Sequence, residues 1–308
     1  MKRIDVSYLS TLVQQAQSSS LLRHIETFTS SRDHTIRRFL HALEPGSYLR
    51  PVSLSTVDKV LLCLQGKVLV ATFTEEQLFD EVVALGADLP SRGLEISAGT
   101  CHCMVALESA SVLYESHYGN LESPVEAPWA PEDEDESSAR HFRHKVILAH
   151  SKEGVLGELL SHGLMERYFE HKTLTRTSLE AAEALGVDVG QIAKSIVLMS
   201  DDGEAVIVVL AGDRRVDLGK VRHALGKKFR IATPEQTLAT TGYLVGSVSP
   251  FAILEPSSIY IDVSLRGFSE IYPAAGSTNN GFRTTFRELT DILGFPRCDF
   301  AKEVVAAL

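Results

Sequence analysis

The chain has 308 residues, of which 44% are hydrophobic, and a formal net charge of −10 at pH 7. This length suits two domains of ordinary size, and the apolar fraction is enough for two cores. No stretch approaches the roughly 18 uninterrupted apolar residues of a membrane helix. The basic residues at the N-terminus are not followed by the apolar region of a signal peptide. We therefore expect a cytoplasmic protein with no membrane partner.

Four cysteines occur in the chain, and no two of them form a Cys-x-x-Cys pair. This spacing argues against a zinc ribbon and a thioredoxin-type redox site. We expect structural or incidental thiols in a reducing compartment. The positions are Cys63, Cys101, Cys103 and Cys298.

The negative net charge argues against a nucleic-acid partner for the chain as a whole. The second half nevertheless holds a basic cluster between positions 214 and 230, in which Asp217 is the one acid. Such a cluster could neutralise phosphates, and a solvated helix face is the alternative. Its members are Arg214, Arg215, Lys220, Arg222, Lys227, Lys228 and Arg230.

An acidic segment separates the two halves. Residues 131–138 read Pro-Glu-Asp-Glu-Asp-Glu-Ser-Ser and contain no apolar side chain after the proline. Such a segment cannot contribute to a core and is typical of a linker. We therefore predict two domains, residues 1–136 and residues 137–308.

The first half is predicted to be mainly β. Apolar residues recur at helical spacing over 8–16, and a second helix is expected at 35–43. Many short strands with regular turns favour a sandwich or barrel after these leading helices. The expected strands are 59–64, 67–73, 93–96, 104–107 and 111–115.

The second half alternates helices and strands, which predicts an α+β domain around a mixed sheet. Thr177 and Glu180 form a capping box that opens a helix, and Gly186 ends it. Asp201-Asp202-Gly203 is a hairpin turn signal. The expected strands are 195–199, 205–210, 251–254 and 259–262, and the expected helices are 177–185, 218–225 and 282–293.

Three turn segments of the second half carry residues suited to a ligand site. Lys194 is a cation at the start of an apolar strand, where it could hold a phosphate or a ribose; a surface lysine is the alternative. Segment 242–251 permits a tight turn whose N–H groups could bind a carbonyl oxygen as negative charge develops on it. Segment 274–277, Ala-Ala-Gly-Ser, suits either a pocket for a small side chain or close backbone packing.

Six segments of the second half, in their order along the chain, resemble the YbaK/ProX family of aminoacyl-tRNA deacylases. The resemblance implies hydrolysis of the ester in a tRNA that is mischarged with a small amino acid of the Cys, Ala, Ser or Thr class. The family often acts on the tRNA for proline, and the hydrolysis needs no cofactor. The segments are 177–187, 191–198, 211–220, 232–235, 242–251 and 261–262.

The resemblance also implies roles for individual residues. The family lysine corresponds to Lys194, and the family glycine-serine-proline loop corresponds to Gly246, Ser249 and Pro250; these four would be catalytic. A water or the neighbouring ribose hydroxyl would attack, because no Ser-His-Asp arrangement is recognisable; we assign His171 a structural role. The expected substrate-binding residues are Ser247, Val248, Ala275, Gly276 and Ser277, and the expected tRNA contacts are Arg214, Arg215, Lys220, Lys227 and Lys228.

Segments 43–51, 64–66, 96–102 and 127–131 of the first half resemble the WbuC-type cupins, which implies a double-stranded β-helix barrel. At the positions of the family's metal ligands, this chain has Val52, Leu54 and Lys59, and only His102 remains. One imidazole is too few for a metal site, and a lysine would repel the ion. We predict a metal-free barrel that binds or dimerises, or one in which Lys59 has created an anion site.

Two other functions fit parts of the sequence. The second half could bind tRNA or a synthetase without catalysis, or the chain could be a cupin-type metal enzyme. Release of free amino acid separates the first from an editing enzyme, and stoichiometric metal would favour the second. We expect mischarged tRNA as the main partner, with a synthetase and a second copy of the chain, bound through the barrel, as further candidates.

Overall fold

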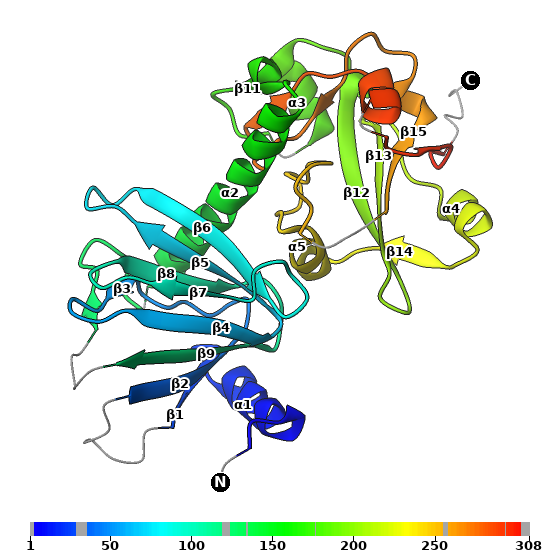
Figure 1. The fold of residues 1–308 in the computed structure, drawn as a ribbon. Helices are drawn as coiled ribbons and strands as arrows, with labels where there is room; N and C mark the ends of the chain where they lie inside the picture. Colours follow the sequence, from blue (N-terminus) through cyan, green and yellow to red (C-terminus); the bar gives the residue numbers. More distant parts are fainter. Residues whose placement is uncertain are drawn as a thin grey trace. The chain divides into compact units, whose positions relative to one another are not determined.

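The computed structural model describes residues 3–28, 36–118, 124–133, 135–175, 177–254, 258–292 and 294–302. The chain divides into two compact units, Met1–His150 and Ser151–Leu308. The predicted domain boundary, at 136/137, lies earlier than this division. Each unit is described by itself below (Figure 1).

The first unit consists of two five-stranded sheets with one leading helix, α1 (Val6–Ser18). One sheet has the order β1-β2-β9-β4-β7, and the other has the order β10-β3-β8-β5-β6. The β-rich character of this half and the five expected strands are confirmed. The strand bounds are β1 Arg23–Thr27, β2 Ile36–Leu43, β3 Val52–Ser53, β4 Lys59–Gln65, β5 Lys67–Phe73, β6 Phe79–Gly86, β7 Gly93–Ile96, β8 Cys101–Ala106, β9 Ser111–Tyr118 and β10 Val125–Glu126.

Helix α1 forms where the sequence predicts it. The side chain of Asp5 caps its first turn by accepting a hydrogen bond from the backbone N–H of Tyr8. Leu9, Leu12 and Val13 are buried on one face and pack on a cluster that includes residues of β2 and β9. Burying such a side chain contributes about 1.5–3 kcal/mol, so packing holds this helix in place.

The helix predicted at 35–43 is wrong, because β2 occupies Ile36–Leu43. β2 pairs with β1 on one side and with β9 on the other, both antiparallel. Its inward positions fill the space between the two sheets, and this tertiary pairing overrides the local helical pattern. The fold has one leading helix where two were expected.

The acidic segment at 131–138, predicted as a linker, is helical at its C-terminal end. Helix α2 (Glu136–Ser161) begins within it and continues for 26 residues. Asp135 accepts a hydrogen bond from the N–H of Ser138, and Glu136 lies in the first turn, where a carboxylate is favourable. None of the helices in the described parts of the chain combines the length and apolarity that a bilayer-crossing segment requires.

The second unit is an α+β domain with a mixed sheet, as predicted. Strands run in the order β14-β12-β13-β15-β18, and β16 pairs with the start of β12. β13 is antiparallel to β12 and parallel to β15. The bounds are β11 Tyr168–Glu170, α3 Ser178–Leu185, β12 Ile192–Ser200, β13 Ala205–Ala211, α4 Leu218–Leu225, β14 Phe229–Ile231, α5 Pro234–Thr241, β15 Ser258–Asp262, β16 Tyr272–Pro273, β17 Asn280–Phe282 and β18 Arg297–Cys298, with 3-10 turns η1 Met165–Arg167, η2 Val189–Gln191 and η3 Val263–Leu265.

Two element predictions fail in this unit. Residues 251–254 form bends and not a strand, because the Tyr243 hydroxyl donates to the carbonyl oxygen of Phe251 at 2.6 Å and holds this segment against the core. The closing helix expected at 282–293 is reduced to the π-helical segment η4 (Glu288–Ile292), because Phe282 belongs to β17.

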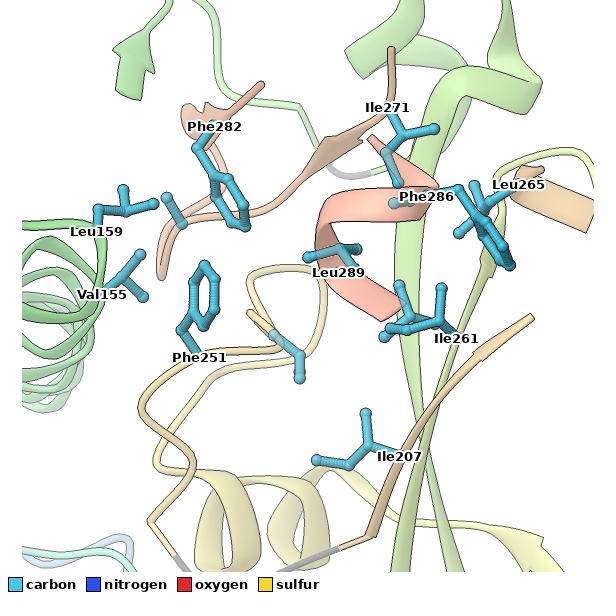
Figure 2. Close-up of a cluster of buried hydrophobic side chains, with 14 of the residues drawn as sticks. Val155, Leu159, Ile207, Phe251, Ile261, Leu265, Ile271, Phe282, Phe286 and Leu289 are labelled. Carbon is cyan, nitrogen blue, oxygen red and sulfur yellow. The ribbon is translucent and has the colours of Figure 1, made fainter. Parts of the chain in front are cut away.

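The core of the second unit joins helix α2 to the sheet (Figure 2). Val155 and Leu159 of α2 face the rings of Phe251 and Phe282, whose centroids are 5.0 Å apart. Strand residues such as Ile207 complete the cluster. This packing fixes segment 242–251 and strand β17 relative to each other, and both of them border the cavity described next.

Candidate active site in the second unit

A cavity of about 290 Å³ lies at the start of β12. Five segments contribute to its wall: the end of β11, one side of α3, the start of β12, the bend at 245–248, and the stretch from β16 to β17. Of the residues expected in the site, Lys194, Gly246, Val248 and Ser277 line this one cavity.

Lys194 is half-buried on β12. Its Nζ donates a hydrogen bond of 2.8 Å to the carbonyl oxygen of Gly212. Burial lowers the pKa of Lys194; the nearby Arg215 adds to this effect, and Asp213 opposes it. An ammonium has three donors, so the group can hold its position with one and offer others to a ligand in the cavity.

Gly212 sets the position of that ammonium. A Cβ atom on Gly212 would meet the carbonyl oxygen of Val189 at 2.3 Å and the Cβ of Ser178 at 2.8 Å. Only glycine therefore fits between the end of β13 and the start of α3. This close approach places the Gly212 carbonyl under Lys194.

The bend at 242–251 is a rigid turn. Gly246 has a φ of +91°, which favours glycine. Ser247 donates from its Oγ to the carbonyl oxygen of Leu244 at 2.8 Å, and the Oγ of Ser249 accepts from the N–H of Phe251 at 3.2 Å. Both serines and Pro250 are buried, so they shape the bend and do not line the cavity.

Three residues of the bend line the cavity: Val245, Gly246 and Val248. Among the hydrogen bonds of the described residues, none uses the amide N–H of Gly246 or Val248 as donor, whereas the N–H of Ser247 donates to Leu244. Two amides next to the cavity are therefore free to donate to a ligand oxygen.

The segment 274–277 divides between the cavity and the core. Ala274 and Ser277 line the cavity, and Ala275 is buried in the core. Gly276 has a φ of +94°, and a Cβ there would lie 2.8 Å from backbone atoms of Ser151. The small residues at 275 and 276 therefore serve close packing, which is one of the two interpretations of this segment.

Sequence reasoning missed an aromatic wall. The rings of Phe169 and Tyr272 meet edge to face at 6.1 Å, and the imidazole of His171 stacks on Phe169 at 6.3 Å. All three line the cavity. The Nδ1 of His171 donates to the carbonyl oxygen of Thr173, so Nε2 is not the atom that makes this hydrogen bond. Strand β11 is only three residues long, so the sequence shows no periodicity from which this wall could be predicted.

The basic cluster does not form one surface. Arg215 lies close enough to Lys194 to affect its pKa, whereas Lys227 and Lys228 precede β14. β14 pairs with the other end of β12, at Ser200, six residues beyond Lys194 or roughly 20 Å along the strand.

Acids from other elements neutralise part of this cluster. Lys220 pairs with Asp299 at 2.8 Å, and Lys227 pairs with Asp202 at 3.0 Å and with Glu204 at 2.5 Å. These three carboxylates lie outside residues 214–230, so the charge of that segment alone overestimates the positive charge of the surface.

Comparison with known proteins identifies related chains for the second half. Residues 173–292 match a family described as an aminoacyl-tRNA editing domain, and residues 4–85 match a domain family of unknown function. The uncharacterized protein YwhH of Bacillus subtilis is 36% identical over 122 residues, which are 40% of this chain and 78% of YwhH.

Two further relatives carry names that describe an activity. The proline–tRNA ligase of Shouchella clausii is 33% identical over 123 residues, 40% of this chain and 21% of the ligase. An Enterococcus faecalis protein named "Putative Cys-tRNA(Pro)/Cys-tRNA(Cys) deacylase EbsC" is 32% identical over 96 residues, 31% of this chain and 58% of EbsC. The chain thus spans about a fifth of the ligase and less than two thirds of EbsC.

Proposed function

The chain belongs to the aminoacyl-tRNA editing domain family, and from this premise we propose which ester its second unit hydrolyses and how. The activity is that of an aminoacyl-tRNA deacylase. We propose a substrate in which a small amino acid, of the Cys, Ala, Ser or Thr class, is joined to the tRNA for proline. The names of the ligase and of EbsC, which both refer to proline or its tRNA, support this choice.

One observation carries the proposal: Lys194, Gly246 and Val248 line the same cavity. They come from a strand and a loop more than 50 positions apart in the sequence. A cation beside free amide donors suits a substrate with a ribose or phosphate at one end and a reactive carbonyl at the other.

In the proposed mechanism, the amides of Gly246 and Val248 donate to the carbonyl oxygen of the ester, where negative charge develops. The Lys194 ammonium orients the terminal ribose of the tRNA. A water attacks the carbonyl carbon and loses a proton; the bond from this carbon to the ribose oxygen breaks, and that oxygen takes up a proton. If the neighbouring ribose hydroxyl attacks first, the amino acid moves to that oxygen, and a water then cleaves the new ester in the same way. Ser249 and Pro250 hold the bend, so their effect on the rate is indirect.

The size and lining of the cavity support the proposal that the substrate carries a small acyl group. The aromatic wall formed by Phe169, His171 and Tyr272 and the bend line the same cavity of about 290 Å³, at the lower end of the range for ligand sites. The cavity has to admit the ribose as well as the amino acid. Ser277 and Val248 are then the expected contacts of the amino-acid side chain.

The tRNA contacts follow from the split of the basic cluster. Arg214 and Arg215 follow the end of β13 that pairs with the start of β12, next to Lys194. We therefore propose that they bind phosphates close to the acceptor end of the tRNA. Lys220, Lys227 and Lys228 would then contact a more distant part of the tRNA. With tRNA as substrate, a cytoplasmic location follows as part of the proposal.

The deciding experiment is a deacylation panel with the full chain and tRNA for proline charged with Ala, Cys, Ser, Thr or Pro. We expect release of the small amino acids and a loss of roughly 100-fold or more in Lys194→Ala, which is the order of effect expected when a group that positions the reacting bond is removed. Lys145→Ala, an exposed lysine of the first unit, is the matched control and should keep full activity. Tight tRNA binding without release of amino acid would favour the non-catalytic alternative.

For the first unit, we propose the cupin-like barrel that the resemblance implies. The two five-stranded sheets support it. We also propose a homodimer through this unit, supported by exposed apolar residues on the outer face of the sheet that contains β2, β9 and β4: Ile36, Val60, Leu62 and Tyr118. Association with a synthetase is a further proposal that follows from the ligase relationship.

A further inference from the structure

The first unit has its own cavity, of about 380 Å³, between its two sheets. One wall is a row of side chains across three neighbouring strands. In the register of the sheet, Arg37 of β2 is opposite His117 of β9, and His117 is opposite Lys59 of β4. All three side chains line the cavity, so two formal cations stand on one wall, on either side of His117.

Glu115 is the acid within this group. Its Oε1 lies 3.1 Å from the Nζ of Lys59, and its Oε2 lies 3.1 Å from the Nε2 of His41. Lys59 is only 4% exposed, so the pair is held in a medium of low dielectric constant. Arg50 also lines the cavity, but its guanidinium is paired with Glu126 and Glu132. Arg37 and Lys59 against Glu115 leave one net positive charge.

The residues present do not fit the metal that a cupin resemblance implies. Both oxygens of Glu115 are already engaged, and the Lys59 ammonium stands beside them, where it would repel a cation. Among the described residues, no group of three or more His, Cys, Asp or Glu side chains is arranged to hold an ion. The cavity holds three imidazoles, those of His41, His102 and His117, where the sequence comparison counted one.

Five polar atoms of the cavity-lining side chains are buried without a hydrogen-bond partner: Nη2 of Arg37, Nε2 of His102, Nδ1 of His117 and both ring nitrogens of His41. The Nε2 of His41 faces Glu115 at 3.1 Å. Two of the others suit a ligand: Nη2 of Arg37 is a charged donor, and Nε2 of His102 belongs to a side chain that is 1% exposed. The Nδ1 of His102 lies 3.1 Å from the carbonyl oxygen of Thr100, which can only accept, so Nδ1 carries the proton. Burial, reinforced by Lys59, lowers the pKa of His102 to about 4. The ring is therefore neutral at pH 7, and Nε2 is an unused acceptor.

The lining also contains apolar side chains. Phe39, Leu49, Val52 and Met104 contribute to it, and the Phe39 ring stacks on His117 at 5.8 Å. A buried charged donor and a buried acceptor without partners each carry a desolvation cost. A ligand that satisfies both and covers the apolar part would remove that cost.

We propose that the first-unit cavity binds the anion of a small hydroxycarboxylic acid. The carboxylate accepts hydrogen bonds from Arg37 and Lys59, the hydroxyl donates to the Nε2 of His102, and the short carbon chain lies against Phe39 and Val52. A ligand with no charge would leave Arg37 unpaired, and a ligand with no hydroxyl would leave His102 unpaired. The assignment involves no tRNA and does not depend on the editing activity.

The test is isothermal titration calorimetry of the full chain with three matched probes. L-Lactate has both groups, propionate lacks the hydroxyl, and lactamide lacks the charge. We expect lactate to bind one to one, lactamide to bind at least about 10-fold more weakly, and propionate about 3- to 10-fold more weakly, as expected for loss of a charged and a neutral hydrogen bond. Equal affinity for lactate and lactamide, or no heat with lactate at millimolar concentration, would overturn the proposal.

Variants locate the site. Arg37→Gln should weaken lactate binding by about 10-fold or more, and Arg38→Gln is its matched control, because Arg38 is the next residue of β2 and is exposed on the other face. His102→Leu should abolish the preference for lactate over propionate. An equal loss in Arg37→Gln and Arg38→Gln, or inorganic phosphate binding more tightly than lactate, would contradict the assignment.

Discussion

Each unit of this protein has a lysine on the wall of a cavity, and the two lysines differ in what surrounds them. Lys194 is half-buried and held by one backbone carbonyl, that of Gly212. Lys59 is almost fully buried and held by a carboxylate, that of Glu115. In the first arrangement, the ammonium of Lys194 is available to a ligand, and removal of this side chain should cost little stability. In the second arrangement, the ammonium of Lys59 is part of the folded core, so its removal leaves the carboxylate of Glu115 buried without a cation beside it.

The comparison predicts that acid acts mainly on the first unit, and this is the largest expected effect. The pKa of His102 is lowered from 6.5 to about 4 by burial and by Lys59. A lowered folded-state pKa gives stability that is present above pH 6.5 and is lost as the pH falls through about 4. For Glu115, burial acts to raise the pKa, but the hydrogen bond from His41 and the charge of Lys59 outweigh it and lower the pKa from 4.5 to about 2. That contribution is lost between about pH 4.5 and 2.

Each of these two groups contributes about 3 kcal/mol near neutral pH. Trp129 is the only tryptophan, and it contacts Phe73 and Phe142 within the first unit. Its fluorescence in urea titrations at pH 7, 5 and 3 therefore reports on this unit. In His102→Gln, the loss between pH 6.5 and 4 should become smaller by the contribution of His102, while His117, His144 and His150, whose pKa values are also lowered by burial, keep theirs. The same pH profile in the variant and the wild type would contradict the role of His102.

Removal of the Lys59 side chain is the next largest effect. Lys59→Met should destabilise the first unit by about 3–5 kcal/mol, because Glu115 is left as a buried charge without its main partner. The double variant Lys59→Met/Glu115→Gln should regain most of this loss. Trp129 fluorescence in urea measures both, and equal destabilisation of the single and double variants would show that lost packing, not the stranded charge, is responsible.

In the second unit, the most sensitive position near Lys194 is a glycine. Gly212→Ala places a Cβ against the Val189 carbonyl and Ser178, which should cost about 1–3 kcal/mol of overpacking strain. It should also displace the Lys194 ammonium and lower deacylation. Gly203→Ser, in the hairpin turn, is the control: its φ of +87° should cost stability, but no atom lies within 4 Å of an added Cβ, so Lys194 should stay in place. Differential scanning calorimetry and the deacylation assay should separate the two effects.

The smallest effect sharpens the contrast between the lysines. Lys194→Met should change the free energy of unfolding by about 1 kcal/mol or less, since it removes one hydrogen bond from a half-exposed group. The same variant should be nearly inactive in deacylation. Thermal unfolding followed by circular dichroism provides the measurement. A destabilisation as large as that of Lys59→Met would mean that Lys194 is a structural residue.

The sequence by itself determined the elements that depend on local chemistry. The capping box at Thr177 with Gly186, the Asp-Asp-Gly hairpin and helix α4 are where patterns placed them, because caps and tight turns are satisfied by neighbouring residues. The sequence also selected Lys194 and Gly246, which the fold brings to one cavity. The roles assigned to these residues remain predictions.

Only the tertiary structure decided what depends on distant partners. Strand pairing made 36–43 a strand, and close packing on Ser151 explained Gly276. Carboxylates from other elements neutralised Lys220 and Lys227. The register across β2, β9 and β4 assembled Arg37, His117 and Lys59 into one wall. Neighbours across a sheet can be scores of residues apart along the chain, so no local pattern encodes which charges will meet in a cavity.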